Sequence, residues 1–148
     1  HPAFRVPEGK TIYDFSFAFH KSGSLHYQSP DPDGYEEEAR SGYLDIKDGT
    51  VPLTKGFFKD VLTYIFDKGQ VDRLSLLADG EPYVTVECPG FPYTALWTVE
   101  ETHPFVCIEP WFGRCAQKGF SGELNDREGI VCLEKNGVFQ TEYVIEIH

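Results

Sequence analysis

Alternation of aromatic and polar side chains over residues 11–20 is the strongest constraint on the fold. The aromatic residues recur at every second position, and the intervening positions are polar or small: Tyr13, Phe15, Phe17 and Phe19 alternate with Asp14, Ser16, Ala18 and His20. A period of two places successive side chains on opposite faces of a β-strand. The segment Thr11–His20 is therefore predicted to be a strand with one large aromatic face.

Short runs rich in β-branched and aromatic residues recur along the rest of the chain. They are Val71–Leu77, Tyr83–Cys88, Tyr93–Thr98, Phe105–Glu109, Ile130–Leu133 and Gln140–Ile147. Turn dipeptides such as Asp79-Gly80, Pro89-Gly90 and Asn136-Gly137 separate some of them. Short strands punctuated by turns are typical of an antiparallel sandwich or barrel, so the sequence predicts an all-β fold.

Two segments are less regular. Gly56–Phe66 has apolar residues at helix-like spacings and also fits a strand, and its short length favours a turn followed by a strand. Ser29–Arg40 is rich in proline and glycine and is expected to be a surface loop with one helical turn. The acidic run Glu36–Glu38 within it is interpreted as a solvated face.

Composition limits the classes of partner. The chain has 148 residues, of which 41% are hydrophobic, so one domain over 1–148 is expected. A net charge of −11 repels phosphate backbones and anionic lipids, which argues against nucleic acid and membrane surfaces. No apolar run approaches the roughly 20 residues that a membrane-spanning helix requires, so we expect a soluble protein.

Cysteine and histidine spacing argues against cofactors. Cys88, Cys107, Cys115 and Cys132 include no C-x-x-C pair, so reduced thiols in the cytoplasm are expected, with a Cys107–Cys115 bridge as the alternative. No two of the five histidines stand two or four residues apart. We therefore expect no metal site.

Glu109 is the first candidate for chemistry. It stands within Val106–Trp111, between apolar residues and directly before Pro110. A carboxylate removed from water has a raised pKa, which brings it toward the range useful for proton transfer. The alternative is an ordinary glutamate at a strand end that meets solvent or a backbone donor.

Aromatic residues gather in the sequence near this carboxylate. They are Phe91, Tyr93, Trp97 and Trp111. Sugars present apolar C–H faces beside directional hydroxyl groups, so a platform of rings next to a carboxylate suits them. The alternative for each ring is core packing, since aromatic residues are abundant in β cores.

The motifs follow one another in the order found in one family. His1-Pro2-Ala3-Phe4, Phe57-x-x-Asp60-x-Leu62, Phe91-Pro92-Tyr93-x-x-Leu96-Trp97 and Phe105–Trp111 with Gly113, with a tail from Asn125 to Ile145, resemble the bacterial aldose 1-epimerases, also called galactose mutarotases. The resemblance implies a large antiparallel β-sandwich, of which this chain matches the C-terminal half.

The resemblance also implies roles for single residues. Glu109 resembles the catalytic glutamate of the family and His1 the histidine of its H-x-x-F-like motif. Asp60 is similar to an aspartate that binds sugar hydroxyls, and Trp97 is expected beside the pocket. The implied activity interconverts the α and β anomers of a hexose by acid/base ring opening and closure, without a metal or organic cofactor.

Two other interpretations also fit the sequence. The chain fits a carbohydrate-binding or regulatory β-sandwich module without turnover, or a structural fragment. A phosphorylated hexose would require a basic cluster, and the sequence offers none. Half of a sandwich would expose strand edges, so self-association or a complementing N-terminal half is expected.

Overall fold

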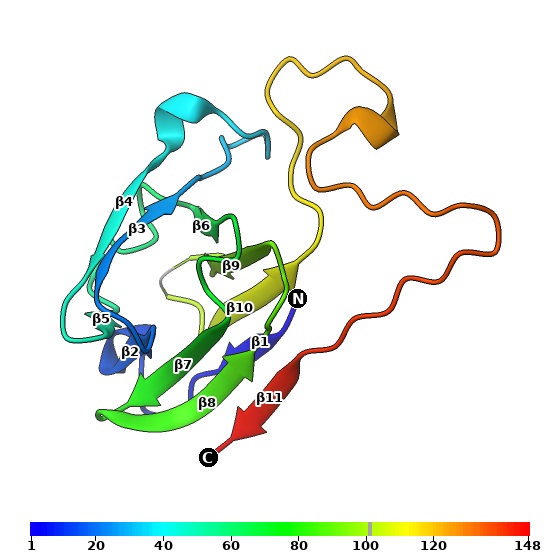
Figure 1. Cartoon of the computed structure of the whole chain (residues 1–148). Coiled ribbons are helices and arrows are strands. Elements are labelled where there is room, and N and C mark those ends of the chain that lie inside the picture. The colour runs from blue at the N-terminus through cyan, green and yellow to red at the C-terminus, as the bar shows by residue number, and fades with distance from the viewer. Residues whose placement is uncertain (101) are drawn as a thin grey trace.

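The computed structural model describes residues 1–100 and 102–148, and its named strands all pair antiparallel, joined by loops and three short 3-10 turns (Figure 1). One sheet has the order β1-β10-β9-β6, formed by Ala3–Arg5, Phe105–Trp111, Tyr93–Trp97 and Thr63–Phe66. The second has the order β11-β8-β7-β2-β5, formed by Val144–Ile147, Glu81–Glu87, Arg73–Ala78, Phe15–Ala18 and Thr50–Pro52. A two-stranded sheet pairs β3 (Gly23–Tyr27) with β4 (Gly42–Ile46). The predicted all-β sandwich is confirmed.

The main core lies between the two larger sheets. The inner strands contribute alternate side chains, and the buried set includes Phe15, Phe17, Leu76 and Val86 from one sheet and Tyr64, Phe66, Leu96, Val106 and Ile108 from the other. Phe19, just after β2, meets Phe66 of β6 edge to face with ring centroids 5.6 Å apart. Burying each such ring stabilises the fold by about 1.5–3 kcal/mol, so the aromatic alternation seen in the sequence closes the sandwich.

Several predicted strands are shorter than expected. The segment Thr11–His20 begins with a 3-10 turn over Ile12–Asp14, because the Asp14 carboxylate accepts the backbone N–H of Thr11 at 2.7 Å and holds the chain in a turn. Only the last four residues of Gln140–Ile147 pair, as β11. The predicted strand Ile130–Leu133 is wrong, since these residues pair with no neighbouring strand in the described chain.

The two irregular segments behave as predicted. A turn ending at Lys59 precedes β6 in Gly56–Phe66, and Ser29–Arg40 is a loop with one 3-10 turn at Glu38–Arg40. The prediction of a solvated acidic face is wrong for Glu36, which is only 7% exposed. An arginine pairs with this carboxylate, as described below, and permits its burial.

The four cysteines are free thiols, so the alternative Cys107–Cys115 bridge is wrong. Cys88 and Cys107 are buried in the sheets, where free cysteine packs as a small apolar residue. Within the described residues no helix has the length and hydropathy needed to cross a bilayer.

Candidate active site

Strand register gives the sheet β1-β10-β9-β6 a second, chemically different face. Its inner face packs into the main core, as described above. The outer face carries Thr63, Ile65, Tyr93, Ala95, Trp97, Cys107, Glu109 and Trp111, which alternate with the core residues along the strands. Ala3 pairs with Cys107, so the same register continued by two residues brings His1 opposite Glu109. Residues far apart in the sequence thus meet by strand pairing.

His1 and Glu109 form the closest acid/base pair of this face. His1 Nδ1 lies 3.0 Å from Glu109 Oε1, and the His1 ring stacks near Trp111 with centroids 6.3 Å apart. The imidazole is 76% exposed, whereas the carboxylate is 1% exposed. Oε1 receives no aligned hydrogen bond within the described residues, so the short contact with His1 is a close approach of two polar groups without hydrogen-bond geometry.

The surroundings of Glu109 set its protonation behaviour. Burial raises the pKa of Glu109, and three groups oppose this effect: a hydrogen bond with the Cys107 side chain, the positive charge of the amino terminus and a hydrogen bond with the Trp111 side chain. Burial and the nearby carboxylate raise the pKa of Cys107 to about 12, so its thiol is protonated and can donate at neutral pH. Glu109 is therefore a positioned carboxylate with a raised pKa, as its apolar frame predicts.

A pocket of about 180 Å³ opens beside this pair. It is lined by His1, Thr63, Trp97, Glu109 and Trp111. Both tryptophans are half-buried and present ring surface to the pocket, whereas Phe91 and Tyr93 are buried. The core-packing alternative thus applies to Phe91 and Tyr93. Trp97 also lines a second pocket of about 470 Å³ on its other side, with Phe58, Lys59, Leu62, Thr98, Val99 and Glu100.

Asp60 lies apart from the acid/base pair. It is exposed in the bend before β6, and it is absent from the residues that line either pocket beside Trp97. Its backbone carbonyl accepts a hydrogen bond from Arg40 Nη2 at 3.0 Å, which links the bend to the 3-10 turn at Glu38–Arg40. Thr63, three residues later, lines the pocket. The structure therefore brings His1, Trp97 and Glu109 together and leaves Asp60 outside their pocket.

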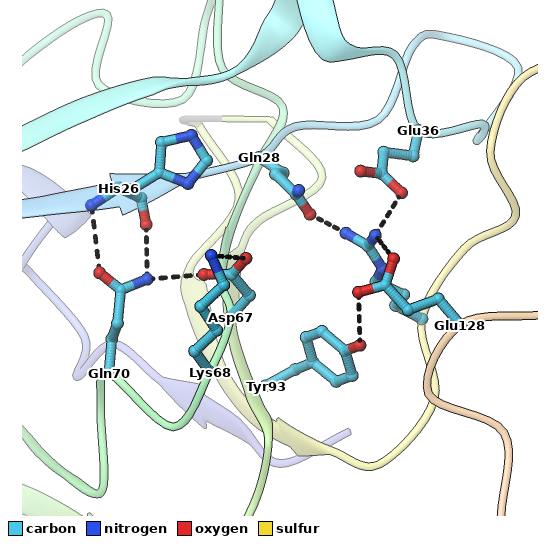
Figure 2. Close-up of polar contacts among 9 residues, drawn as sticks. His26, Gln28, Glu36, Asp67, Lys68, Gln70, Tyr93 and Glu128 are labelled. Carbon is cyan, nitrogen blue, oxygen red and sulfur yellow. Dashed lines mark hydrogen bonds and ion pairs between the residues drawn. The ribbon is translucent and has the colours of Figure 1, made fainter.

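A polar network that the sequence did not predict adjoins the other end of the same sheet face. The Arg114 guanidinium, only 3% exposed, donates to Gln28 and Glu128 and lies 2.8 Å from Glu36 Oε2 (Figure 2). The 2.8 Å contact is an ion pair without aligned hydrogen-bond geometry, since Glu36 Oε2 accepts none. Arg114 also lies over the Tyr93 ring, 5.5 Å from its centroid.

A second part of the network ties β3 to the end of β6. Gln70 exchanges two hydrogen bonds with the backbone of His26, at 3.2 and 3.0 Å, and donates to Asp67 at 2.9 Å (Figure 2). Asp67, Lys68 and Arg114 line a polar hollow of about 350 Å³ with Glu36 and Glu128. The sequence signal was Arg114, three residues after Trp111, whose role becomes visible only when the fold brings Glu36 and Glu128 to it.

No group of three or more His, Cys, Asp or Glu side chains is arranged to hold a metal ion within residues 1–100 and 102–148. The carboxylate, the imidazole and the tryptophan rings are the groups that the pocket offers to a ligand. A buried carboxylate with one oxygen free of aligned hydrogen bonds can accept a proton, and a nearby imidazole can donate one. Ring surfaces beside them offer apolar contact to a ligand that carries hydroxyl groups.

Comparison with known proteins gives relatives of larger size. No family model matches the chain. The chromosomal and plasmid forms of protein LacX from Lactococcus lactis subsp. lactis are each 28% identical over 123 residues, which cover 76% of this chain and 39% of the relative. The chain thus spans well under half of the length of these curated relatives.

Solved structures match the whole chain. A galactose mutarotase related enzyme from Lactobacillus acidophilus superposes with a TM-score of 0.83 at 27% identity, covering 100% of this chain and 50% of the neighbour. A galactose mutarotase-like protein from Lactobacillus casei superposes with a TM-score of 0.75 at 22% identity, covering 99% of this chain and 51% of the neighbour, and supports the fold alone. The chain therefore has the fold of galactose mutarotase-related proteins and corresponds to about half of one, its C-terminal half.

Proposed function

We propose that the pocket around Glu109 is the acid/base centre of an aldose 1-epimerase that interconverts the anomers of a hexose. One observation carries this proposal: His1 Nδ1 and Glu109 Oε1 lie 3.0 Å apart. They come from two paired strands and open into a pocket that also contains Trp97 and Trp111. The likeness to galactose mutarotase-related structures supports a carbohydrate ligand.

The reaction needs two proton transfers, and the pair offers both. Glu109 Oε1 accepts the proton of the C1 hydroxyl while the His1 imidazolium donates a proton to the ring oxygen. The bond between C1 and the ring oxygen breaks and leaves an open-chain aldehyde. The aldehyde rotates, and ring closure reverses both proton transfers, so atoms and charge balance over the cycle.

The remaining contacts set the substrate class. Trp97 and Trp111 offer ring surface to the apolar C–H face of a hexose. We propose that the Asp60 carboxylate accepts a hydrogen bond from a sugar hydroxyl. This contact requires the bend before β6 to move toward the Trp97 side of the pocket when the sugar binds. The proposal places this activity in the cytoplasm, an assignment that four free thiols support.

A carbohydrate-binding module without turnover is the second candidate, and one observation favours it. His1 is 76% exposed, whereas a general acid is held within about 0.5 Å of its productive position by its neighbours. Such a module would retain the tryptophan contacts with the sugar and lack an ordered acid.

Polarimetry separates the two candidates. The probe is pure α-D-galactose, added to the 148-residue chain and to the same chain preceded by the first half of the Lactobacillus acidophilus neighbour, here called the extended form. We expect little acceleration of mutarotation by the chain alone and clear acceleration by the extended form, in which His1 is an internal strand residue.

The His1→Asn variant of the extended form supplies the control. We expect its rate to fall by about 10²-fold or more, the usual contribution of one general acid. Full activity of the bare chain, or an unchanged rate in the extended His1→Asn variant, would remove His1 from the mechanism. Sugar-dependent thermal stabilisation without any acceleration in the extended form would instead establish the binding module.

A further inference from the structure

Four polar side chains form a hydrogen-bonded row across the outer face of the sheet that contains β2, β7, β8 and β11. His20 Nε2, just after β2, lies 2.9 Å from Ser75 Oγ of β7. Ser75 Oγ lies 2.7 Å from Thr85 Oγ1 of β8, and Thr85 Oγ1 lies 3.0 Å from Nε2 of His148, just after β11. The row therefore links β2 to β11 across the two strands that lie between them (Figure 1).

The two hydroxyl groups in the middle of the row are closed off from water. Ser75 and Thr85 are each 1% exposed. They lie opposite each other in the register of β7 and β8 and alternate with core residues, so they occupy the outer face. A serine beside a histidine can serve as a nucleophile, but a substrate cannot reach an oxygen that is buried to this degree. The row therefore suits a change of protonation and not covalent chemistry.

The number of hydrogens gives the row a direction. Three contacts require three hydrogens, and each hydroxyl supplies one. The third must come from a ring, so one histidine donates from Nε2 and the other accepts at Nε2. If both rings carried a hydrogen on Nε2, one buried hydroxyl would be left without an acceptor in the row, which costs free energy. Protonation of the two rings is therefore coupled.

Charged neighbours determine the role of His20. Arg73 of β7 and Glu87 of β8 act on its ring and pair with each other, with Arg73 Nε 3.2 Å from Glu87 Oε1. Burial lowers the pKa of His20, Arg73 lowers this pKa further, and Glu87 opposes both effects. On the other side of β2, β5 places the uncharged Thr50 beside Ala18. His20 is therefore the ring that accepts at neutral pH.

The surroundings of His148 favour the opposite role. Glu146 Oε2 lies 3.8 Å from His148 Nε2, and a carboxylate attracts a hydrogen to the nitrogen that it faces. From β8, the Thr85 hydroxyl contacts the same nitrogen, and the Tyr83 carbonyl accepts the backbone N–H of His148 at 3.2 Å. His148 is therefore the donating end of the row.

We propose that this row is a pH-sensitive link between β2 and β11, in which hydrogen bonds run from His148 through Thr85 and Ser75 to His20 and break when His20 takes up a proton. A protonated His20 ring cannot accept the Ser75 hydroxyl. The His20 side chain is exposed, so its ring turns to solvent and water takes its place beside Ser75.

The sign of the pH dependence follows from His20. Its pKa is lowered in the folded chain, so folding favours the neutral ring. The link is fully present above the ordinary pKa of histidine and is lost as the pH falls through the lowered pKa of folded His20. Since Glu109 lies on the other large sheet, the link goes beyond the proposed function and does not depend on it.

Nitrogen-15 NMR of the imidazole rings tests the direction of the row. The 148-residue chain is measured at about pH 8, above the ordinary pKa of histidine. We expect His20 to carry its hydrogen on Nδ1 and His148 to carry one on Nε2, with the resonances assigned from His20→Gln and His148→Gln. A hydrogen on Nε2 of His20, or the same form in both rings, would overturn the proposal.

Two substitutions at His148 test the coupling over the whole row. In His148→Gln the side-chain amide can turn and accept from Thr85, so the row can reverse when His20 is protonated. His148→Leu also removes the ring and offers no acceptor. We expect His20 to bind its proton about tenfold more tightly in His148→Gln, because only the leucine variant leaves a buried hydroxyl unpaired. Equal titration of His20 in the two variants would show that the row carries no coupling and refute the proposal.

The distance between the His20 ring and Ser75 tests the break itself. Nuclear Overhauser contacts between the ring and the Ser75 β-protons should be present at about pH 8 and absent once His20 is protonated. Contacts between the rings of Phe19 and Phe66, which meet in the core, should persist and show that the fold is intact. If the contacts between His20 and Ser75 also persist after protonation, the link is no switch and the proposal is wrong.

Discussion

Two buried glutamates at the outer side of one sheet have opposite surroundings. Glu36 is 7% exposed and faces the Arg114 guanidinium, which is itself buried and anchored by Gln28 and Glu128. Glu109 is 1% exposed and faces His1, whose ring is largely exposed beside a pocket. Burial raises the pKa of both carboxyl groups.

The difference shows which buried carboxylate is available for chemistry. The Arg114 guanidinium is buried and held by Gln28 and Glu128, so its ion pair with Glu36 ties the loop 28–36 to the chain after β10. The partner of Glu109 is an imidazole that lines the pocket and can either donate or accept a proton. Glu36 therefore serves the structure, and we assign the chemistry to Glu109.

The largest expected effect separates the two carboxylates by activity. Glu109→Gln keeps the shape of the side chain and removes the proton acceptor, so mutarotation of galactose by the extended form should fall by about 10²–10⁴-fold. The matched variant Glu36→Gln should retain a rate within a few-fold of the parent. Polarimetry measures both, and near-normal rates for Glu109→Gln would exclude it as the base.

The next effect concerns stability. Arg114→Met removes the cation and leaves Glu36 buried without compensation, so unfolding free energy should fall by about 3–5 kcal/mol. Arg73→Met removes an exposed ion pair in which Arg73 Nε lies 3.2 Å from Glu87, and should cost only about 0–1 kcal/mol. Urea denaturation gives both values. Equal losses of unfolding free energy in the two variants would show that the buried Arg114 ion pair stabilises the fold no more than an exposed ion pair does.

A smaller effect is expected at Asp60. A hydrogen bond between a carboxylate and a sugar hydroxyl is worth about 1.5–3 kcal/mol, so Asp60→Asn should weaken galactose affinity in the extended form by that amount. Asp33→Asn, at another exposed loop aspartate, serves as the control. Calorimetry measures the affinities and thermal melts check the fold. Unchanged affinity for Asp60→Asn would remove this residue from the binding site.

The smallest expected effect is a change in how stability depends on pH. A carboxyl group whose folded-state pKa is raised favours folding when protonated, so its contribution is fully present below the unfolded pKa and is lost as the pH rises through the folded pKa. Burial raises the pKa of Glu109. We therefore expect the melting temperature of Glu109→Gln to exceed that of the parent at neutral pH, and the gap to close in acid. A gap that widens in acid would show that the charged form is favoured by folding.

Local pattern predicted the strands better than it predicted the site. Alternation at Phe15 and Phe17, and the apolar runs of β7 to β10, reflect a two-residue period that any buried sheet imposes. Ile130–Leu133 shows the limit of this argument, since strand propensity produces a strand only where a neighbouring edge is present. Recognition of the family motifs supplied Glu109, His1 and Trp97, and the structure brings all three to one pocket.

The Arg114 network could not be predicted from the sequence, for a physical reason. Arg114 meets Gln28 and Glu36 through pairings between distant segments, and no spacing along the chain encodes that meeting. The acidic run around Glu36 has the composition of a solvated surface. Only a cation placed opposite it by the fold explains the burial of Glu36.

Carbon-13 NMR of the glutamate carboxyl groups tests the central claim most directly, because it observes Glu36 and Glu109 in one sample. The extended form is titrated with D-galactose at constant pH, and the two resonances are assigned with Glu36→Gln and Glu109→Gln. The account predicts that galactose shifts the Glu109 resonance while the Glu36 resonance stays unchanged. A shift of Glu36 alone, or no change at Glu109 while sugar binding is detected elsewhere, would contradict it.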